Sequence, residues 1–457
     1  MRTRETDSPS SNYTLQSLQG PARNPIGTMD AAHYIPMQAP HPAISKVLTV
    51  MLAGGAGQRL FPLTKDIAKP AVPFGGVYRI IDITLSNSIN SGLRKIYILT
   101  QYKAITLNRH IRQAWNVVSP ELGEFIEILP PAKRTGETWY LGTADAVYQN
   151  AQSIEAEELP YTLIAAADHV YKTNYEHVLE QHLKLDAEVT VATTQVTPQD
   201  ARRFGVVDIG EDLRVAGFEE KPRHDHPVRS RFNPEMCSGS MGVYLFNTDF
   251  LLWALREDHD EKGSKHDFGA DILPQLVKQG RRVYAYDFVD ENKKQDLPYW
   301  RDIGTLDAYY EANRDLVSVS PIFNLYDEDW PIRTYQPQFP PAKFVFAEEG
   351  RRMGVSINSM LCSGCIISGG RVVNSILSPG VRINSYSEVE SSLVFPNAEI
   401  GRHSRIRRTI VDQDILLPER SEIGFDLETD RKLGHFVTES GIVHANSPGG
   451  ELLLRPR

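Results

Sequence analysis

The stretch KVLTVMLAGGAGQRL, residues 46–60, decides how the first part of the chain folds. Its first eight residues are mostly apolar and include β-branched residues, and glycines follow them directly at 54, 55 and 57. A short apolar run that ends in glycines predicts a buried strand and a tight turn. Further strands are predicted at 95–100, 162–167 and 189–193, with helices over 144–155 and 175–185 between them. This alternation predicts a Rossmann-like α/β domain with a mixed, mostly parallel sheet.

A different period begins near residue 360. Apolar residues recur at spacings of six, six and five, so the pattern repeats every seventeen residues through four turns without an insertion. An amphipathic helix would need spacings of three and four instead. The period predicts a parallel β-helix, which the family resemblance given below implies is left-handed, with one apolar residue of each side pointing inward and each coil stacked on the next. The inward positions are Met360, Ile366, Val372, Leu377, Ile383, Val389, Val394, Ile400, Ile406, Val411, Leu417 and Ile423.

These patterns divide the chain into five parts. We expect a disordered tail over 1–44, an α/β domain over 45–315, a proline-rich linker over 316–354, the β-helix over 355–430 and an extension over 431–457. The tail is rich in Ser, Pro, Asn and Gln and has no apolar core of the kind that a signal peptide needs. No apolar run approaches the roughly 20 residues that span a bilayer. We therefore expect a cytoplasmic protein with no membrane partner.

Composition narrows the possible functions. The formal net charge is -9, which argues against a nucleic-acid partner because such proteins carry a basic face. Three cysteines occur, at 237, 362 and 365, so we expect no disulfide framework. The C-x-x-C of Cys362 and Cys365 lacks the second ligand pair of a zinc site, and we interpret both as inert.

The glycine turn fits an anion better than it fits a known nucleotide loop. It lacks the G-K-[ST] of a Walker A loop, and Leu60 replaces the last glycine of a dinucleotide fingerprint. Its backbone N–H groups can approach an anionic group closely, and Arg59 and Lys69 add positive charge. Taken alone, the same residues are equally consistent with a plain surface turn.

Several further motifs make the match specific. They are Leu52–Leu60 with Lys69-Pro70, Phe74–Ile83, Leu85–Gly92, Trp139–Ala146, His266–Gly269, Tyr299–Thr305 and Trp330–Tyr335. Together they resemble the sugar-nucleotide pyrophosphorylases, and in particular the ADP-glucose pyrophosphorylase (glucose-1-phosphate adenylyltransferase) family, over roughly residues 46 to 430. The resemblance implies a nucleotidyltransferase that joins ATP to α-D-glucose 1-phosphate, releases pyrophosphate and serves glycogen-type glucan synthesis. It also implies a homotetramer and small-molecule allosteric effectors.

The resemblance assigns roles to particular residues. Catalysis is assigned to Arg59, Lys69 and Asp168. The nucleotide site is assigned to Leu52, Gly54, Gly55, Gly57, Arg59, Gln101, Tyr140, Gly142 and Thr143. Glucose 1-phosphate is assigned to Tyr140, Glu220, Lys221, Ser240, Asp267 and Trp300.

Two carboxylates are expected to hold Mg²⁺. Asp168 ends a predicted strand, at the sheet edge where open α/β sheets bind ligands, and Asp302 lies far away in sequence. Brought together, they can hold one Mg²⁺ among phosphate oxygens, and the resemblance gives both residues this role. Each aspartate alone is as readily a helix cap or loop residue.

The chain departs from the family pattern at a few positions. Gln58 stands where the family more often has Thr, and Ala167 where Gly usually precedes the aspartate. Asp66 occupies a position where some members place an activator-binding Lys, so the effector is expected to differ.

Other functions stay open at this stage. A pyrophosphorylase for another NDP-sugar would keep the first turn and both aspartates, and a regulatory subunit would have lost them. An acyltransferase would use the β-helix, with His403 as its base. A glycosyltransferase would use one of the D-x-D patterns at 258–260, 327–329 and 412–414, none of which follows a buried strand of the first domain.

Overall fold

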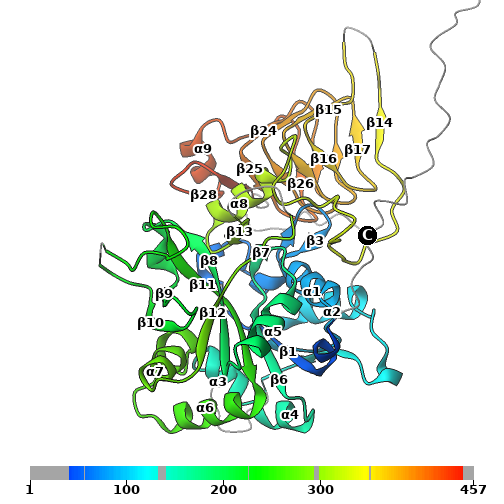
Figure 1. Ribbon diagram of the computed structural model, residues 1–457. Coiled ribbons are helices and arrows are strands. Elements are labelled where there is room, and N and C mark those ends of the chain that lie inside the picture. The colour runs from blue at the N-terminus through cyan, green and yellow to red at the C-terminus, as the bar shows by residue number, and fades with distance from the viewer. Residues whose placement is uncertain are drawn as a thin grey trace, which may run out of the picture. The chain divides into compact units, whose positions relative to one another are not determined.

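The computed structural model describes residues 41–55, 57–131, 140–224, 226–292, 298–348 and 351–445 (Figure 1). The tail expected over 1–44 lies outside these residues up to position 40. Regular structure begins at η2 (Pro42–Lys46), and Ile44 is buried in the core of the first domain. Within the described residues, no helix is both long and apolar enough to cross a bilayer.

The first domain is built on one mixed sheet that holds nine strands within the described residues. Its central strands β6, β1, β4 and β5 run parallel, in that order, and β11 pairs antiparallel with β6 and β8. The expected α/β domain is therefore confirmed. The strands are β1 (Val47–Ala53), β4 (Lys95–Thr100), β5 (Phe125–Leu129), β6 (Tyr161–Ala166), β8 (Val189–Val196), β9 (Gly205–Ile209), β10 (Val215–Glu220), β11 (Cys237–Asn247) and β12 (Val283–Asp287).

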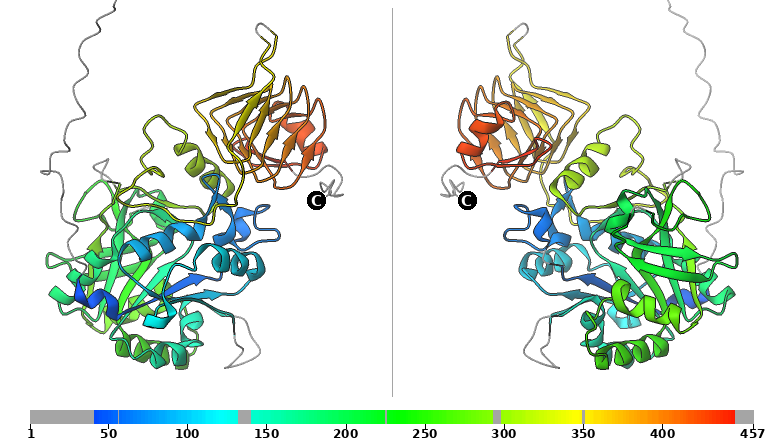
Figure 2. Two further views of the ribbon diagram at one scale, coloured as in Figure 1. Left: turned by 90° about the vertical axis from the view of Figure 1, so that its right-hand side faces the viewer. Right: turned by 90° about the vertical axis from the view of Figure 1, so that its left-hand side faces the viewer.

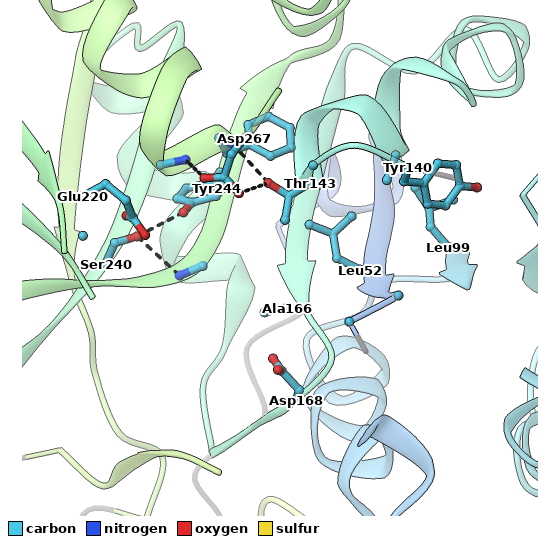
Figure 3. A pocket seen from close by; sticks show the side chains of 18 of the residues that line it. Leu52, Leu99, Tyr140, Thr143, Ala166, Asp168, Glu220, Ser240, Tyr244 and Asp267 are labelled. Carbon is cyan, nitrogen blue, oxygen red and sulfur yellow. Dashed lines mark hydrogen bonds between the residues drawn. The ribbon is translucent and has the colours of Figure 1, made fainter. Parts of the chain in front are cut away.

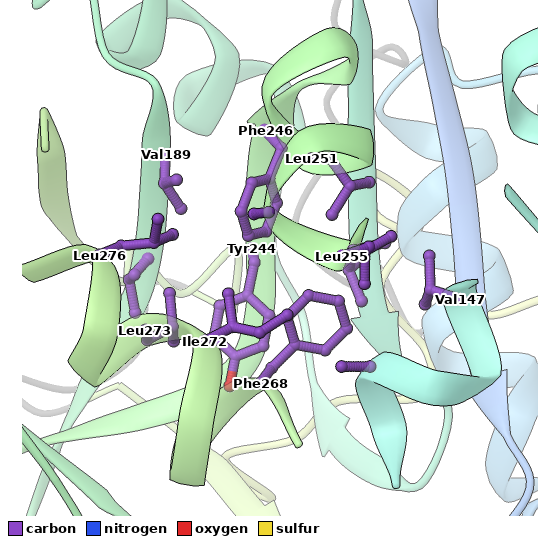
Figure 4. Close-up of a cluster of buried hydrophobic side chains, with 14 of the residues drawn as sticks. Val147, Val189, Tyr244, Phe246, Leu251, Leu255, Phe268, Ile272, Leu273 and Leu276 are labelled. Atoms are coloured by element: carbon purple, nitrogen blue, oxygen red, sulfur yellow. The ribbon is translucent and has the colours of Figure 1, made fainter. Parts of the chain in front are cut away.

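Helices cover both faces of this sheet, which is why its strands are apolar on both sides. On β1, Leu48 and Val50 face one layer, and Met51 and Ala53 face the other. This alternation is the period of two that a strand imposes. The first layer, part of which is drawn in Figure 4, contains α3 (Thr143–Tyr148), α6 (Thr248–Asp260) and α7 (Leu273–Lys278). The second contains α1 (Ile80–Asn90) and α2 (Ala104–Ala114), and a further cluster contains α5 (Tyr175–Lys184).

The helix expected over 144–155 is two helices, α3 and α4 (Ala151–Ala156). The Asn150 side chain donates to the carbonyl of Ala146 at 2.8 Å, and its own backbone leaves the helical region with ψ of 12°. Short polar side chains that bond to the backbone in this way compete with the helical ladder. The single-helix prediction was wrong for that reason.

The second domain consists of stacked coils that form three sheets of parallel strands, so the expected parallel β-helix is confirmed (Figure 2). Partners across the later steps are seventeen residues apart, as in Val372, Val389 and Ile406. In the first coil the register differs by one, because Leu361 and Ile367 pair with Leu377 and Ile383, so the inward positions expected at 360 and 366 were wrong. Three strands outside the expected span of 355–430 join these sheets. β14 (Lys343–Val345) pairs with β17 (Ile366–Ser368), β29 (Val443–Ala445) pairs with β25 (Thr409–Val411), and β28 (Phe436–Val437) pairs antiparallel with β29. The period of the sequence missed all three because none of them carries a complete coil.

Buried hydroxyls repeat at the same interval and hold successive coils together. The hydroxyl of Ser387 accepts from the backbone N–H of Ser404, and the hydroxyl of Ser404 accepts from Ser421, each at 3.2 Å. Ser387 and Ser404 are fully or almost fully buried. Because buried N–H groups need partners, this ladder fixes the register that the apolar residues leave free.

Helix α8 (Leu306–Asp315) connects the α/β domain to the coils. The Tyr310 hydroxyl donates to the carbonyl of Ser391, and Arg314 donates to the carbonyl of Asn374. An apolar cluster shared by the two domains includes residues of α8 together with Ile376, Leu393 and Phe395 of the β-helix.

The C-x-x-C pair, the D-x-D patterns and His403 all make contacts that stabilise the fold. Cys362 and Cys365 are free, and burial raises their pKa values to about 12 and about 11. In the D-x-D patterns at 258–260 and 327–329, the first aspartate accepts hydrogen bonds that hold a loop in place. In the pattern at 412–414, the last aspartate accepts a hydrogen bond from a neighbouring coil. Asp258 accepts from Ser264 and His266, Asp327 from Lys172, and Asp414 from Asn397. His403 stacks on Tyr386 between coils, with ring centroids 4.9 Å apart.

Candidate active site

Three neighbouring parallel strands end at one edge of the sheet, and each is followed by a residue of the site. Gln101 follows β4, Gly54 follows β1, and Asp168 lies two residues beyond the end of β6. Carboxyl ends of parallel strands are where open α/β sheets bind ligands. The sheet order therefore brings these residues together although they are far apart in sequence.

Asp302 reaches the same place through a separate pair of short strands. β13 (Trp300–Asp302) pairs antiparallel with β7 (His169–Tyr171), and Asp302 lies opposite His169 in the register. This register puts Asp302 next to Asp168. The two carboxylates share one cation, because Lys69 Nζ is 2.8 Å from Asp168 Oδ2 and 3.4 Å from Asp302 Oδ1.

The charge of Asp168 is strongly stabilised. Burial by itself would raise the pKa of its carboxyl group, but the positive charge of Lys69, the proximity of His169 and the hydrogen bond from Lys69 outweigh burial. The pKa of Asp168 therefore lies well below its ordinary value. At neutral pH the residue is a carboxylate that can bind a cation but cannot serve as a general base of ordinary strength.

Asp168 lies in the wall of a cavity of about 520 Å³. In Figure 3, Leu52, Leu99 and Tyr140 lie on one side of this cavity and Glu220, Ser240 and Tyr244 on the other, with Asp168 below them. The cavity thus has two halves that meet near the carboxylate. Most of the expected site residues line it: Leu52, Gly54, Gly55, Gln101, Tyr140, Gly142, Thr143, Asp168, Glu220, Lys221, Ser240 and Asp267.

Glu220 is held between two glycines. A Cβ on Gly269 would lie 2.5 Å from Glu220 Oε2, and a Cβ on Gly205 would lie 2.8 Å from the same oxygen. Any side chain at either position would displace the carboxylate. Lys221 Nζ donates to the other oxygen of Glu220, and the side chain of Lys221 is 61% exposed. Lys221 is therefore free to turn toward a ligand.

Asp267 acts chiefly as a helix cap. Its Oδ1 accepts from the backbone N–H groups of Gly269 and Ala270, and its Oδ2 accepts from the Thr143 hydroxyl at 2.9 Å. The two loops are in close contact, since a Cβ on Gly142 would lie 2.2 Å from the carbonyl oxygen of His266. Asp267 and Thr143 thus join the two halves of the cavity.

Five of the expected residues do not line the cavity as it stands. Arg59 is exposed, and Gly57 packs against Thr64 beside it. Trp300 lies behind the wall, with its ring centroid 4.9 Å from those of His169 and Phe204. Lys69 and Asp302 stand just outside the lining, where they contact Asp168 or each other.

Three wall residues carry little signal in the sequence. Tyr244 bonds to the Ser240 hydroxyl at 3.2 Å, and Arg203 and Phe204 precede β9, whose first residue Gly205 packs against Glu220. A glycine that opens a strand often marks a close backbone approach. Gly205, which follows Phe204, carries that signal, but only the fold reveals that the side chains of Phe218 and Glu220 approach it.

Comparison with known proteins places this geometry in context. Residues 48–319 match the family model described as nucleotidyl transferase, and residues 340–444 match one described as GlmU-like, C-terminal hexapeptide. The chain is 59% identical to a glucose-1-phosphate adenylyltransferase of Koribacter versatilis, over 87% of this chain and 94% of the relative. It is 52% identical to one of Rhodopirellula baltica, over 91% and 92%, and 49% identical to one of Nitrosospira multiformis, over 86% and 92%.

Proposed function

The chain belongs to the glucose-1-phosphate adenylyltransferase family, and from that premise we propose how its cavity carries out the reaction. The enzyme is a nucleotidyltransferase that transfers the adenylyl group of ATP to α-D-glucose 1-phosphate, giving ADP-glucose and pyrophosphate. Its family uses a divalent metal ion. We propose that this ion is Mg²⁺ and that the ADP-glucose serves glycogen-type glucan synthesis.

The two halves of the cavity take one substrate each. We assign ATP to the half that the glycine turn, Gln101 and Tyr140 line, where backbone N–H groups are exposed next to small residues. Glucose 1-phosphate takes the half with Glu220 and Ser240, whose oxygens suit sugar hydroxyls. Lys221 reaches the sugar phosphate, because its half-exposed ammonium group is at the rim of this half.

The residues present fit a magnesium ion. Asp168 and Asp302 already have a cation between them, the ammonium group of Lys69. Within the described residues no cluster of three metal-binding side chains occurs. Mg²⁺ commonly binds to one or two carboxylates and takes its remaining ligands from water and substrate phosphates, so two aspartates suffice. When bound, the ion neutralises charge on the reacting phosphates.

The chain's own residues position two anions rather than move a proton. The second pKa of a sugar phosphate is about 6, so the attacking oxygen is already charged at neutral pH. No general base is required. Lys69 and Lys221 lower the repulsion between the substrates, and the two halves of the cavity hold the attacking oxygen in line with the departing pyrophosphate. Arg59 is assigned to the phosphates of ATP, which requires its exposed side chain to turn inward.

One observation carries this proposal: a single ammonium group lies within hydrogen-bonding distance of both Asp168 and Asp302. The test measures pyrophosphate release with ATP, UTP, dTTP and GTP, each with glucose 1-phosphate and Mg²⁺. We expect ATP to give the highest kcat/KM. A preference for another nucleotide would indicate a pyrophosphorylase of different base specificity, and no turnover with any of them would indicate a regulatory subunit.

Assembly and regulation are proposed on the family resemblance alone. We propose a homotetramer in the cytoplasm that responds to a small-molecule effector. Sedimentation or light scattering measures the assembly. The same turnover assay, repeated with phosphorylated sugars and nucleotides, identifies the effector.

A further inference from the structure

Arg203 binds one of the two proposed metal ligands from the side opposite Lys69. Its Nη2 lies 3.1 Å from Asp302 Oδ2, whereas Lys69 is bonded to Asp302 Oδ1. The side chain of Asp302 is only 10% exposed, and each of its two carboxylate oxygens contacts a cationic group. Arg203 itself is 36% exposed in its side chain and lines the cavity. It therefore contacts the acidic centre and the substrate space at once.

Arg203 Nη1 also lies 3.8 Å from Oδ1 of the half-exposed Asp200 on its own short helix. At the two proposed metal ligands themselves the charges balance without a metal ion, because Asp168 and Asp302 face Lys69 and Arg203. A divalent ion added to this set would leave two excess positive charges, and the ion would compete with the guanidinium group for an oxygen of Asp302. Of the two cations, Arg203 is the easier to release, because Lys69 is buried and bonded to both carboxylates.

Arg203 lies on the sugar side of the cavity. It ends the short helix η6 (Asp200–Arg203), and the next residue, Phe204, accepts a backbone hydrogen bond from Lys221 at 3.0 Å. Its guanidinium group also rests on the Phe204 ring, with 5.6 Å between Cζ and the ring centroid. A planar guanidinium group beside Lys221 suits bidentate binding of a phosphate group.

We propose that Arg203 exchanges partners during the reaction cycle. In the metal-free site it neutralises Asp302, and once a divalent ion takes that carboxylate it binds the phosphate of glucose 1-phosphate together with Lys221. This inference rests on the proposed function, since it needs a metal ion at Asp302 and a sugar phosphate in this half. It makes Arg203 a substrate-binding residue whose availability depends on the metal.

The test uses the full-length enzyme and two readouts. Binding of Mn²⁺ as a probe for Mg²⁺ is followed by the electron paramagnetic resonance of the free ion, without substrates and without turnover. Initial rates give kcat and the separate KM values for glucose 1-phosphate and ATP. The variants are Arg203→Ala, Arg203→Lys, Asp302→Asn and, as a matched control, Arg202→Ala, which removes an exposed arginine from the same short helix.

In Arg203→Ala we expect Mn²⁺ to bind several-fold more tightly, because its competitor is gone. We expect the KM for glucose 1-phosphate to rise roughly tenfold or more, as for a lost charge-assisted hydrogen bond, with the KM for ATP nearly unchanged. Arg203→Lys keeps the charge without the planar group and should fall between Arg203→Ala and wild type. Arg202→Ala should match wild type in both readouts.

The opposite result has a clear signature. If Arg203 only anchors Asp302, then Arg203→Ala binds Mn²⁺ more weakly and loses kcat while the KM for glucose 1-phosphate stays constant, which overturns the inference. Asp302→Asn separates this outcome from a failure of the proposed function. Wild-type Mn²⁺ affinity in Asp302→Asn refutes the metal site itself. Lost affinity there, combined with unchanged values in Arg203→Ala, refutes only the exchange.

Discussion

The ammonium group of Lys69 lies 2.8 Å from a carboxylate oxygen of Asp168, although the two residues are 99 positions apart. This contact forms because η4 (Lys69–Ala71) and the end of β6 meet at the carboxyl edge of the sheet. The same ammonium group is 3.4 Å from Asp302. An acidic pair of this kind, bridged by one buried lysine, is the centre on which the first two predictions depend.

Asp168→Asn should abolish most turnover and leave the fold intact. The amide keeps the shape of the carboxylate but loses the negative charge that a metal ion requires, so kcat should fall by roughly 10²–10³-fold. Pyrophosphate release measures the loss, and circular dichroism checks the fold. Asp412→Asn, on an exposed turn of the β-helix, makes the same chemical change away from the cavity and should retain full activity. Near-normal activity of Asp168→Asn would refute the assigned role.

Lys69→Ala should make the protein depend on divalent ions for stability. Without the lysine, two carboxylates face each other with less compensating charge, and a metal ion becomes the natural replacement. We expect Mg²⁺ to raise the Tm of this variant more than it raises that of wild type, measured by differential scanning fluorimetry. Lys69→Arg retains the charge and should respond as wild type does. Equal Mg²⁺ responses in all three proteins would contradict a shared cation site.

Local sequence patterns were enough to predict the strand that ends near Asp168 and the coils of the β-helix. The apolar run before Asp168 and the period of seventeen can each be recognised within a short stretch of neighbouring residues. The pairing of β13 with β7 is different in kind. It joins positions 300–302 to 169–171, and nothing in either short segment specifies its partner. The sequence therefore left the meeting of Asp302 with Asp168 to the family resemblance.

The same limit explains the residues that the sequence did not reveal. Arg203 is the second of two adjacent arginines, and only tertiary packing distinguishes it from the exposed Arg202. The position of Glu220 depends on Gly205 and Gly269, which reach it from a neighbouring strand and from the short helix η7 (Phe268–Ile272). Trp300 belongs to a motif of the family, yet it packs behind His169 instead of facing the cavity. Contacts of this kind depend on side-chain direction, which periodicity does not report.

Gly269→Ala should weaken sugar phosphate binding selectively. The added Cβ would lie 2.5 Å from Glu220 Oε2, so the carboxylate must move from its place beside Ser240. We expect the KM for glucose 1-phosphate to rise about tenfold, in line with loss of a hydrogen bond from a charged group, and the KM for ATP to change little. Gly217→Ala, on the same strand as Glu220, meets only an ordinary contact at 3.4 Å and serves as the control. A parallel rise in both KM values would mean that the two halves are not separate sites.

Ser404→Ala should destabilise the β-helix without altering the kinetics. The Ser404 hydroxyl is fully buried, donates to the carbonyl of Pro418 at 3.1 Å and accepts from the backbone N–H of Ser421. Its loss leaves the Ser421 N–H without its partner, while the Pro418 carbonyl keeps the bond from the Ser421 hydroxyl, at a cost of about 1–3 kcal/mol. Ser421→Ala removes the last hydroxyl of the ladder, which makes an exposed bond to Pro418, and should cost less. Thermal unfolding compares both variants with wild type, and a Tm of Ser404→Ala equal to that of wild type would show that the ladder adds no stability.

The last prediction concerns acid stability and His182. The ring is buried, lies 2.9 Å from the Thr190 hydroxyl and 3.1 Å from Asn247 Oδ1, and its burial lowers the pKa below the ordinary value of 6.5. The unfolded chain therefore takes up this proton more readily than the folded one, so the contribution to stability is present above about pH 6.5. It is lost as the pH falls from there toward the folded pKa, at no more than about 1.4 kcal/mol per pH unit.

Urea unfolding at several pH values between 7.5 and 5.5 tests this for wild type and His182→Gln. Glutamine cannot take up a proton, so the variant should lose less stability over this range, whatever its stability at pH 7.5. His177→Gln, on the same helix but with a side chain 43% exposed in wild type, controls for the chemical change of histidine to glutamine. Because the comparison uses slopes, the carboxylates that also titrate contribute equally to all three proteins and cancel. Identical slopes for wild type and His182→Gln would mean that the buried ring takes up its proton as easily in the folded protein as in the unfolded chain.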